Sequence, residues 1–208
     1  MTMGAAESTE PPGRRARRVA QTRQRIVEAA VDLHTTVGPP LTTISGIAER
    51  AGVQRHTVYA HFPDEAELFA ACSGLWQHRN PFPDVEAWAL IDDPRERLAT
   101  ALNELYAFYS RSGADVVAVF AGAERSPSMT RFLADRAQQY AAIAGVLARG
   151  RGARGRRRTR LLAALEHAVH IDTWRSLCAT GGLTEAEAVT LLIALVEAAD
   201  APSAGGPP

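Results

Sequence analysis

Residues 42–62, TTISGIAERAGVQRHTVYAHF, decide the fold, because they predict two short helices joined by a tight turn. Apolar residues of the first helix recur at i, i+3, i+4 and i+7: Ile44, Ile47, Ala48 and Ala51. Thr42 or Thr43 would cap its start. Gly52 can take the left-handed conformation that ends a helix, and Val53 can fill the corner before the next one. The stretch therefore predicts a helix-turn-helix.

The second helix of the pair has one narrow apolar side, formed by Val58 with Phe62 behind it. Its other side chains can form hydrogen bonds: Gln54, Arg55, His56, Thr57, Tyr59 and His61. The major groove of DNA admits one helix and displays donors and acceptors on its base edges. This polar face therefore predicts a DNA-reading helix. Phe62 and Tyr59 could instead be core aromatics, and His61 a capping residue.

Around this pair the chain resembles the DNA-binding domain of the TetR family of bacterial transcription regulators, over roughly residues 21–69. The resemblance starts at TRQRIVEAAVDLHTTVG, continues through IAERAGV and TVYAHF, and closes with FPDEAELF. It implies an all-α fold, in which an N-terminal three-helix helix-turn-helix domain precedes a C-terminal helical domain for ligand binding and dimerisation. It also implies a ligand-responsive repressor that binds a pseudo-palindromic, double-stranded operator as a homodimer.

The resemblance assigns roles to individual residues. Phosphate contacts would come from Thr43, Thr57, Tyr59 and His61, and base contacts from Gln54, Arg55 and His56. Two residues depart from the family pattern. Glu65 stands where many members have a phosphate-binding lysine, and Gln54 stands where a serine usually caps the recognition helix, although glutamine is a weaker cap.

Composition favours an all-α globular chain. Of the 208 residues, 46% are hydrophobic, which suffices for a sizeable core, and no strand-like alternation appears. Cys72 and Cys178 lie far apart and lack metal-ligand spacing, which favours reduced thiols in a cytoplasmic protein. No apolar run is long enough for a membrane span, and no signal-peptide pattern precedes the first helix. We therefore expect no membrane partner.

The formal net charge is zero, but the basic charge is concentrated. Between Gly13 and His61, eight arginines face three acidic residues, and the whole chain contains no lysine. A second run, Arg149 to Arg160, holds seven arginines and three glycines and reads as a flexible loop entering the next helix. It could bind an acidic partner or phosphate, or be a solvated connection.

Turn signals and composition divide the chain into four parts. We expect a disordered basic arm over residues 1–18, a helix-turn-helix domain over 19–63, a ligand-binding and dimerisation domain over 64–200, and a disordered tail over 201–208. The arm could follow phosphates or enter a minor groove, or remain solvated. Within the ligand domain, a helix carrying Leu98 to Tyr109 is expected to be separate from a shorter apolar piece, residues 116–120.

Candidate ligand-binding residues are the aromatic and polar side chains expected on the inner helices: Trp88, Phe108, Tyr109, Phe120, Phe132, His167, His170 and Trp174. His167 and His170 share a helix face, but no third ligand accompanies them, so we favour pocket or interface polarity over a metal. The last two amphipathic helices resemble the dimerisation element of the family, although an intrachain core would show the same pattern.

Other functions remain open at this stage. No hydrolase, metalloprotease, P-loop or dinucleotide motif occurs, so no enzyme activity and no cofactor is expected. The alternatives are a non-specific DNA-binding protein and a small-molecule-binding helical protein with a vestigial helix-turn-helix. Salt dependence separates the first of these from a sequence reader, because binding to phosphates alone fades with salt and ignores sequence.

Overall fold

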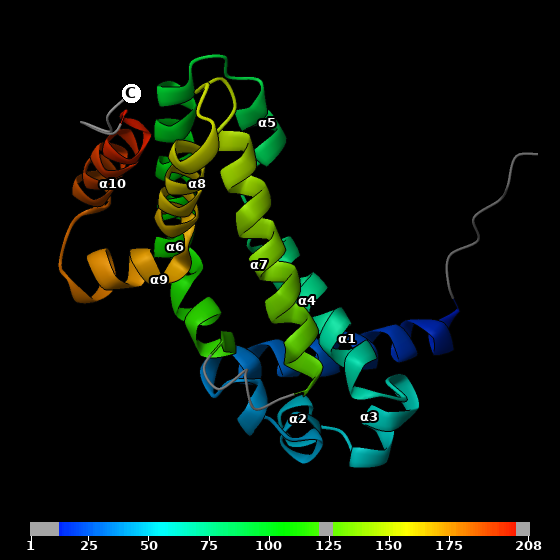
Figure 1. Cartoon of the computed structure of the whole chain (residues 1–208). Helices are drawn as coiled ribbons and strands as arrows, with labels where there is room; N and C mark the ends of the chain where they lie inside the picture. The colour runs from blue at the N-terminus through cyan, green and yellow to red at the C-terminus, as the bar shows by residue number, and fades with distance from the viewer. Residues whose placement is uncertain (1–12, 121–126, 203–208) are drawn as a thin grey trace, which may run out of the picture.

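The computed structural model describes residues 13–120 and 127–202, and within them the side chains of 120 and 127–132 are not described. The described residues form helices and no strand. Figure 1 shows two parts: α1, α2 and α3 gather at one end of the molecule, and α5 to α10 form a second bundle. The all-α class and this two-part order agree with the prediction. No described helix is long and apolar enough to cross a membrane.

The helix-turn-helix forms as its local signals predict. Helix α2, Ile44–Ala51, is capped by Thr43, whose Oγ1 accepts a hydrogen bond from the amide of Gly46 at 3.0 Å. Gly52 ends it in the left-handed conformation, with φ of 64°, which a side chain would strain. Helix α3, Arg55–His61, follows, and Gln54 makes no side-chain capping bond.

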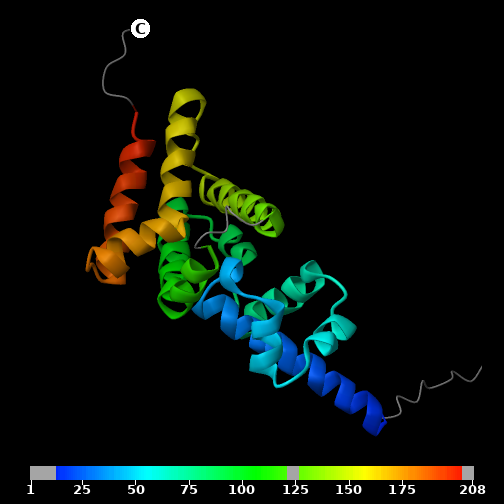
Figure 2. The same cartoon turned by 90° about the horizontal axis from the view of Figure 1, so that it is seen from below.

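Helix α1, Arg14–Thr36, begins earlier than predicted. The expected disordered arm over 1–18 is therefore wrong for Arg14 to Arg18, which lie on the first turns of the helix. Arginine and alanine are strong helix formers, and a polar composition alone does not distinguish an exposed helix from disorder. Figure 2 shows this end of α1 extending beyond the other helices. The rest of the predicted arm, residues 1–12, lies outside the described residues.

Helix α4, Glu65–Arg79, joins the two parts. Asp64 caps it by accepting a 2.7 Å hydrogen bond from the amide of Glu67, as its sequence spacing predicts. Leu68 and Cys72 pack in the same core as α1 to α3. The domain boundary predicted after residue 63 therefore falls before a helix whose first half packs with the DNA-binding part.

The second part begins with α5, Val85–Ala89, and α6, Pro94–Phe120. The break expected between residues 109 and 116 is absent, because α6 runs through it without interruption. Gly113 lies in this stretch against Trp174, and a Cβ on Gly113 would come 2.5 Å from Cζ3 of that ring. The glycine thus marks a close helix contact where we expected a helix end. Helix α7, Pro127–Leu147, packs along α8.

The last helices form the outer layer of the second part. They are α8, Gly155–Val169, then α9, Ile171–Trp174, continuing into η3, Arg175–Thr180, and finally α10, Glu185–Asp200. Helix α10 packs on α8 and α6. It starts at the predicted capping box between Thr184 and Glu187. The predicted tail begins where α10 ends, and residues 203–208 lie outside the described part.

The arginine-rich run is not one flexible loop, because residues 155–160 already belong to α8. The side chain of Arg151 is only 4% exposed and forms ion pairs with Glu197 and Asp200 at 3.5 and 3.4 Å. Arg157 pairs with Asp200 at 2.8 Å. Nη2 of Arg160 donates to the carbonyl oxygen of Ala201, the C-cap of α10, at 2.7 Å. Three of the seven arginines therefore bind the end of α10, and the acidic partner of this run lies partly within the chain.

Two separate hydrophobic cores follow the two parts. The smaller holds residues of α1 to α4, with Ile26, Val58 and Phe62 buried. The larger is built on α6, where Leu98, Leu102, Leu105 and Tyr106 are fully buried. Because each part has its own core, the space between them is a natural place for a bound molecule.

Candidate functional site

The N-terminal end of α3 presents the predicted reading residues to solvent. Gln54, Arg55 and His56 are exposed, whereas Val58 on the opposite side is completely buried. Phe62 is 2% exposed and therefore belongs to the core, the alternative given above for it. Tyr59 is 42% exposed, which excludes the core alternative for this ring. The helix thus has a fixed apolar side and an exposed polar side.

Arg55 and Tyr59 interact with each other along the exposed face of α3. Nη2 of Arg55 donates a 3.1 Å hydrogen bond to the Tyr59 hydroxyl, and its guanidinium carbon lies 5.6 Å from the ring centroid. Residues at i and i+4 are neighbours on a helix, so this contact is built into the sequence. The tyrosine thereby holds the arginine along the helix axis, close to the residues that would meet DNA.

The other predicted phosphate-binding residues lie near this face. Thr43 is exposed at the start of α2, and its hydroxyl already accepts the capping bond, which leaves its proton available to a phosphate oxygen. Thr57 and His61 are half-buried on α3. Glu65 is exposed at the first turn of α4, where a carboxylate suits the helix dipole but repels phosphate.

Arginines near the DNA-binding part differ in what they do. Arg25 donates to the carbonyl oxygens of Ala51 at 2.7 Å and Gly52 at 3.2 Å, so it satisfies the end of α2. Arg23 stacks over the Phe62 ring at 4.4 Å. Both were counted above only as positive charge. The structure gives them a second role in holding the helix-turn-helix together.

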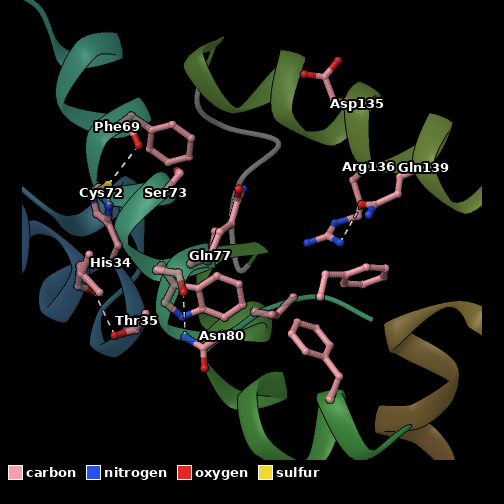
Figure 3. Close-up of a pocket in the computed structure, with 16 residues that line it drawn as sticks. His34, Thr35, Phe69, Cys72, Ser73, Gln77, Asn80, Asp135, Arg136 and Gln139 are labelled. Carbon is pink, nitrogen blue, oxygen red and sulfur yellow. Dashed lines mark hydrogen bonds between the residues drawn. The ribbon is translucent and has the colours of Figure 1, made fainter. Parts of the chain in front are cut away.

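A cavity of about 440 Å³ lies between the two parts of the molecule (Figure 3). Its walls come from the end of α1, from α4, from the connection before α5, and from α6 and α7. Trp76, Phe82 and Phe108 supply aromatic walls. This volume lies in the range of small-molecule sites.

Polar side chains enter the cavity from three helices. His34 and Thr35 come from α1, whereas Arg136 and Gln139 come from α7 (Figure 3). Ser73 and Gln77 on α4, with Asn80 at its C-cap, complete the set. Nη1 of Arg136 donates to Oε1 of Gln139 at 3.0 Å, and Nδ2 of Asn80 donates to the carbonyl oxygen of Trp76 at 3.0 Å.

His34 and Cys72 meet at the edge of this cavity, with Nδ1 3.3 Å from Sγ. Burial lowers the pKa of His34 from 6.5 to about 4, so the imidazole is neutral at neutral pH. Burial also raises the pKa of the Cys72 thiol to about 11, and Sγ donates to the carbonyl oxygen of Phe69 at 3.2 Å. The pair is therefore uncharged and has no thiolate character.

Only one of the predicted ligand-binding residues with a described side chain, Phe108, lines this cavity. Trp88 is 1% exposed and donates through Nε1 to Glu104 at 2.8 Å, and Tyr109 is 1% exposed and donates to the carbonyl oxygen of Val169 at 2.8 Å. These hydrogen bonds let both polar aromatics pack in the core. The side chains of Phe120 and Phe132 lie outside the described residues.

The remaining predicted ligand-binding residues lie on the other side of the second part. His167 and His170 line an open groove of about 820 Å³ formed by α7 to α10, and Trp174 lines a shallower hollow. Within the described part of the chain, no group of three or more His, Cys, Asp or Glu side chains could hold a metal ion. Leu191 and Leu195 on α10 also line the groove and are 50% and 44% exposed.

The lining residues on α4 and α7 were not among the predicted site residues, although their spacing in the sequence carries a signal. Ser73 and Gln77 have i, i+4 spacing, which places two polar side chains on one face of α4, and Asn80 follows at the C-cap. Arg136 and Gln139 have i, i+3 spacing. Most of the predicted ligand-binding residues are aromatic, and aromatic residues are common in cores, whereas these lining residues are polar.

The family comparison matches the part of the chain that carries the helix-turn-helix. The model described as "Bacterial regulatory proteins, tetR family" matches residues 26–72, from α1 into α4. Over these residues, which include the helix-turn-helix, the chain is similar to this family. The match ends at Cys72, so it includes the half of α4 that packs with α1 to α3.

A bacterial regulator resembles a short part of the chain. The uncharacterized HTH-type transcriptional regulator TtgW of Pseudomonas putida is 41% identical over 58 residues, which are 28% of this chain and 43% of the relative. The chain thus matches less than half the length of that relative.

Two solved structures are similar over most of the chain. AibR in complex with isovaleryl coenzyme A and operator DNA has a TM-score of 0.61 at 17% identity, covering 84% of this chain and 97% of that one. A TetR-like transcriptional regulator from Rhodococcus sp. RHA1 has a TM-score of 0.56 at 23% identity, covering 85% and 93%. At these identities the likeness establishes the fold alone.

Proposed function

We propose that the chain is a sequence-specific DNA-binding transcriptional regulator that represses its targets and is released by a small molecule. The observation that carries this proposal is the cavity between the two parts. Its lining includes His34 on α1 and Ser73 on α4, from helices of the DNA-binding part, and Phe108 on α6. A molecule bound there touches the reading unit and the second part at once.

The reading unit would act through α3. Arg55 can donate two hydrogen bonds to O6 and N7 of a guanine, which contributes about 1–3 kcal/mol of discrimination. Gln54 and His56 would add base contacts, while Thr43, Thr57, Tyr59 and His61 would bind phosphates. Phosphate contacts set position and affinity, whereas the base contacts set specificity.

One reading helix covers few base pairs, so we propose that two copies of the chain bind one operator. A two-fold dimer presents its reading helices to half-sites separated by about 34–36 Å. The open groove formed by α7 to α10, with half-exposed Leu191 and Leu195, supports a contact between copies on this side. The structure of AibR with an acyl coenzyme A and operator DNA agrees with a regulator of this kind.

The effector would act by favouring one arrangement of α4. Because α4 packs with α1 in the DNA-binding core and also lines the cavity, its position sets where the reading unit lies relative to the second part. A ligand shifts this equilibrium by no more than the difference between its affinities for the two arrangements. We propose no catalytic role, and we place the protein in the cytoplasm with its DNA.

Binding of the purified chain to the intergenic DNA beside its own gene tests the proposal. The control is scrambled DNA of the same length and composition, at physiological salt. Tight binding to the intergenic DNA alone supports a sequence-specific regulator. If the two affinities are equal, a genome-wide selection of bound fragments follows, and recovery of fragments without a shared sequence would overturn the proposal in favour of a non-specific binder.

A further inference from the structure

The first turns of α1 carry a row of exposed polar side chains along one face. Arg14, Arg18, Gln21 and Arg25 follow one another at i, i+4, i+7 and i+11, which places them on the same side of the helix. All four are exposed, and the first buried residue of α1 is Ile26. The match to the family model begins at Ile26, so it does not include this row. We call these four residues the α1 ridge.

One end of the α1 ridge is fixed beside the residues proposed to read bases. Arg25 donates to the carbonyl oxygens of Ala51 at 2.7 Å and Gly52 at 3.2 Å, where α2 ends. Gly52 is two positions before Gln54, where those reading residues begin. The ridge therefore starts at the turn of the helix-turn-helix and continues along α1 away from it. Figures 1 and 2 both show this end of α1 extending past the other helices of the DNA-binding part.

The length and charge of the α1 ridge suit a contact with the backbone of DNA. From Arg14 to Arg25 the helix rises by about 16 Å, which corresponds to about five base pairs at 3.4 Å each. Residues 11–27 contain six arginines and neither Asp nor Glu. Arg14 and Arg18 take part in none of the ion pairs between described residues. Positive charge without a counter-charge from the described part of its own chain attracts an anionic polymer.

We propose that the α1 ridge binds the phosphate backbone of double-stranded DNA next to the half-site that α3 reads. This inference rests on the proposed function, because it adds a second contact to the same DNA. Arg14 and Arg18 bind phosphates, while Arg25 holds the ridge against the helix-turn-helix. Like charges at i, i+4 destabilise a helix, and a phosphate between Arg14 and Arg18 removes this repulsion. Phosphates carry no base information, so the ridge raises the affinity without changing the sequence preference.

Two double variants of the full chain test this contact. The ridge variant, Arg14→Gln with Arg18→Gln, loses two charges from the ridge. The control variant, Arg15→Gln with Arg17→Gln, loses two exposed charges from the same turns but from other faces of the helix. Glutamine forms helices about as well as arginine, so we expect both variants to keep α1, and circular dichroism checks this.

The affinity of each variant is measured for the intergenic DNA beside the gene and for scrambled DNA at physiological salt. We expect the ridge variant to bind both DNAs roughly tenfold or more weakly, by the same factor, and the control variant to lose less than about threefold. Arg14→Lys with Arg18→Lys should bind within about threefold of the unmodified chain, because an ammonium group also binds phosphate. Equal losses in the two glutamine variants, or a lysine variant as weak as the ridge variant, would overturn the proposal.

Hydroxyl-radical footprints on the intergenic DNA locate the contact. The unmodified chain and the control variant should protect the backbone about five base pairs further outward than the ridge variant does. Footprints of equal length would show that the ridge does not lie on the flanking backbone and would overturn the proposal.

The scrambled DNA separates this proposal from that of a sequence-specific regulator. A ridge variant that binds scrambled DNA more weakly than the control variant supports the ridge, even if the unmodified chain shows no preference for the intergenic DNA. Conversely, the unmodified chain can prefer the intergenic DNA while the ridge variant binds both DNAs as tightly as the control variant. That result would support the regulator and overturn the ridge contact, leaving the ridge to an acidic protein or to solvent.

Discussion

The indole Nε1 of Trp76 on α4 donates a 2.9 Å hydrogen bond to Oδ2 of Asp115 on α6. The two residues are 39 positions apart, and the bond ties the second half of α4, the helix that joins the two parts, to α6 of the second part. Trp76 also lines the cavity between these parts. One side chain thus touches the candidate ligand site, the connecting helix and the longest described helix.

Trp76→Phe is expected to loosen the second half of α4. The change removes the hydrogen bond to Asp115 while keeping an aromatic ring, so the free energy of unfolding should fall by about 1 kcal/mol. Amide hydrogen exchange should increase in the second half of α4. Trp88→Phe is the matched control, because it removes a 2.8 Å bond to Glu104 within the second part. If Trp76→Phe leaves exchange in α4 unchanged, the bond does not hold this helix.

Arg55→Ala should relax base preference, whereas Tyr59→Phe should weaken binding to matched and scrambled DNA alike. Arg55 reads bases in the proposal and Tyr59 binds phosphate, but the two side chains share a hydrogen bond in the free protein. The double variant should therefore deviate from additivity by about 0.5 kcal/mol or more. Affinities for both DNAs, measured for all four proteins, check this. If each single variant loses as much affinity for matched DNA as for scrambled DNA, the proposed division of roles is wrong.

The extended end of α1 should contribute to the salt dependence of DNA binding. Replacing Arg14, Arg17 and Arg18 by Gln should therefore reduce this dependence. All three are exposed, and each phosphate contact that is lost lowers the slope of log K against log salt by about 0.9. The control is the triple change to Gln at Arg154, Arg156 and Arg158, which are exposed near the start of α8. The slope is measured between low and physiological salt. If the two triple variants have identical slopes, the arginines at the start of α1 do not contact phosphates.

Leu191→Asp with Leu195→Asp should produce a monomer. Both leucines are about half-exposed on α10, and two carboxylates at an apolar contact between copies would be buried without partners. Leu90→Asp is the control, because Leu90 is 84% exposed and lies outside this groove. Sedimentation velocity gives the mass of each variant, and circular dichroism shows that it is folded. A double variant that keeps the mass of the unmodified chain would exclude this face as the contact.

Stability should fall as the pH drops from about 6.5 toward 4 because of His34. Its folded pKa is lowered from 6.5 to about 4, so in this range the unfolded chain binds a proton that the folded chain does not. The contribution is fully present above pH 6.5, and at most about 3 kcal/mol is lost by pH 4. Urea unfolding at several pH values measures the slope. His34→Gln should flatten it, whereas the exposed His78→Gln should not, and equal slopes in the two variants would contradict the assignment.

Local signals explain why much of the fold could be predicted from the sequence. The caps at Thr43, Asp64 and Thr184 and the left-handed Gly52 each use residues within three or four positions, so pattern and structure agree there. Family resemblance supplied the order of the two parts. Where we were wrong, the cause was a tertiary contact or an exposed helix, as at Gly113 and at Arg14 to Arg18.

The candidate sites divide in the same way. The residues expected to read DNA lie together on one short helix, so helical spacing alone brings them to one face. The cavity combines residues far apart in sequence, such as His34, Asn80 and Gln139, and their meeting depends on how α1, α4 and α7 pack. An aromatic residue looks the same in sequence whether it lines a cavity or, like Trp88 and Tyr109, fills a core with its polar atom satisfied.

Gly113 lets α6 approach the Trp174 ring more closely than any other residue would allow. The Trp174 ring lies so close to this residue that a Cβ would overlap it, while the neighbours Ser112 and Ala114 both carry one. The residues on the same face of α6 lie four positions away, Tyr109 and Val117, so sliding α6 along its own axis would bring larger side chains to the ring. Asp115 is two residues away on the same helix and accepts the hydrogen bond from Trp76, so the contacts of α6 with α4 and with α9 lie within one helical turn. The absence of one methyl group at Gly113 thus fixes the position of α6 along its own axis relative to Trp174.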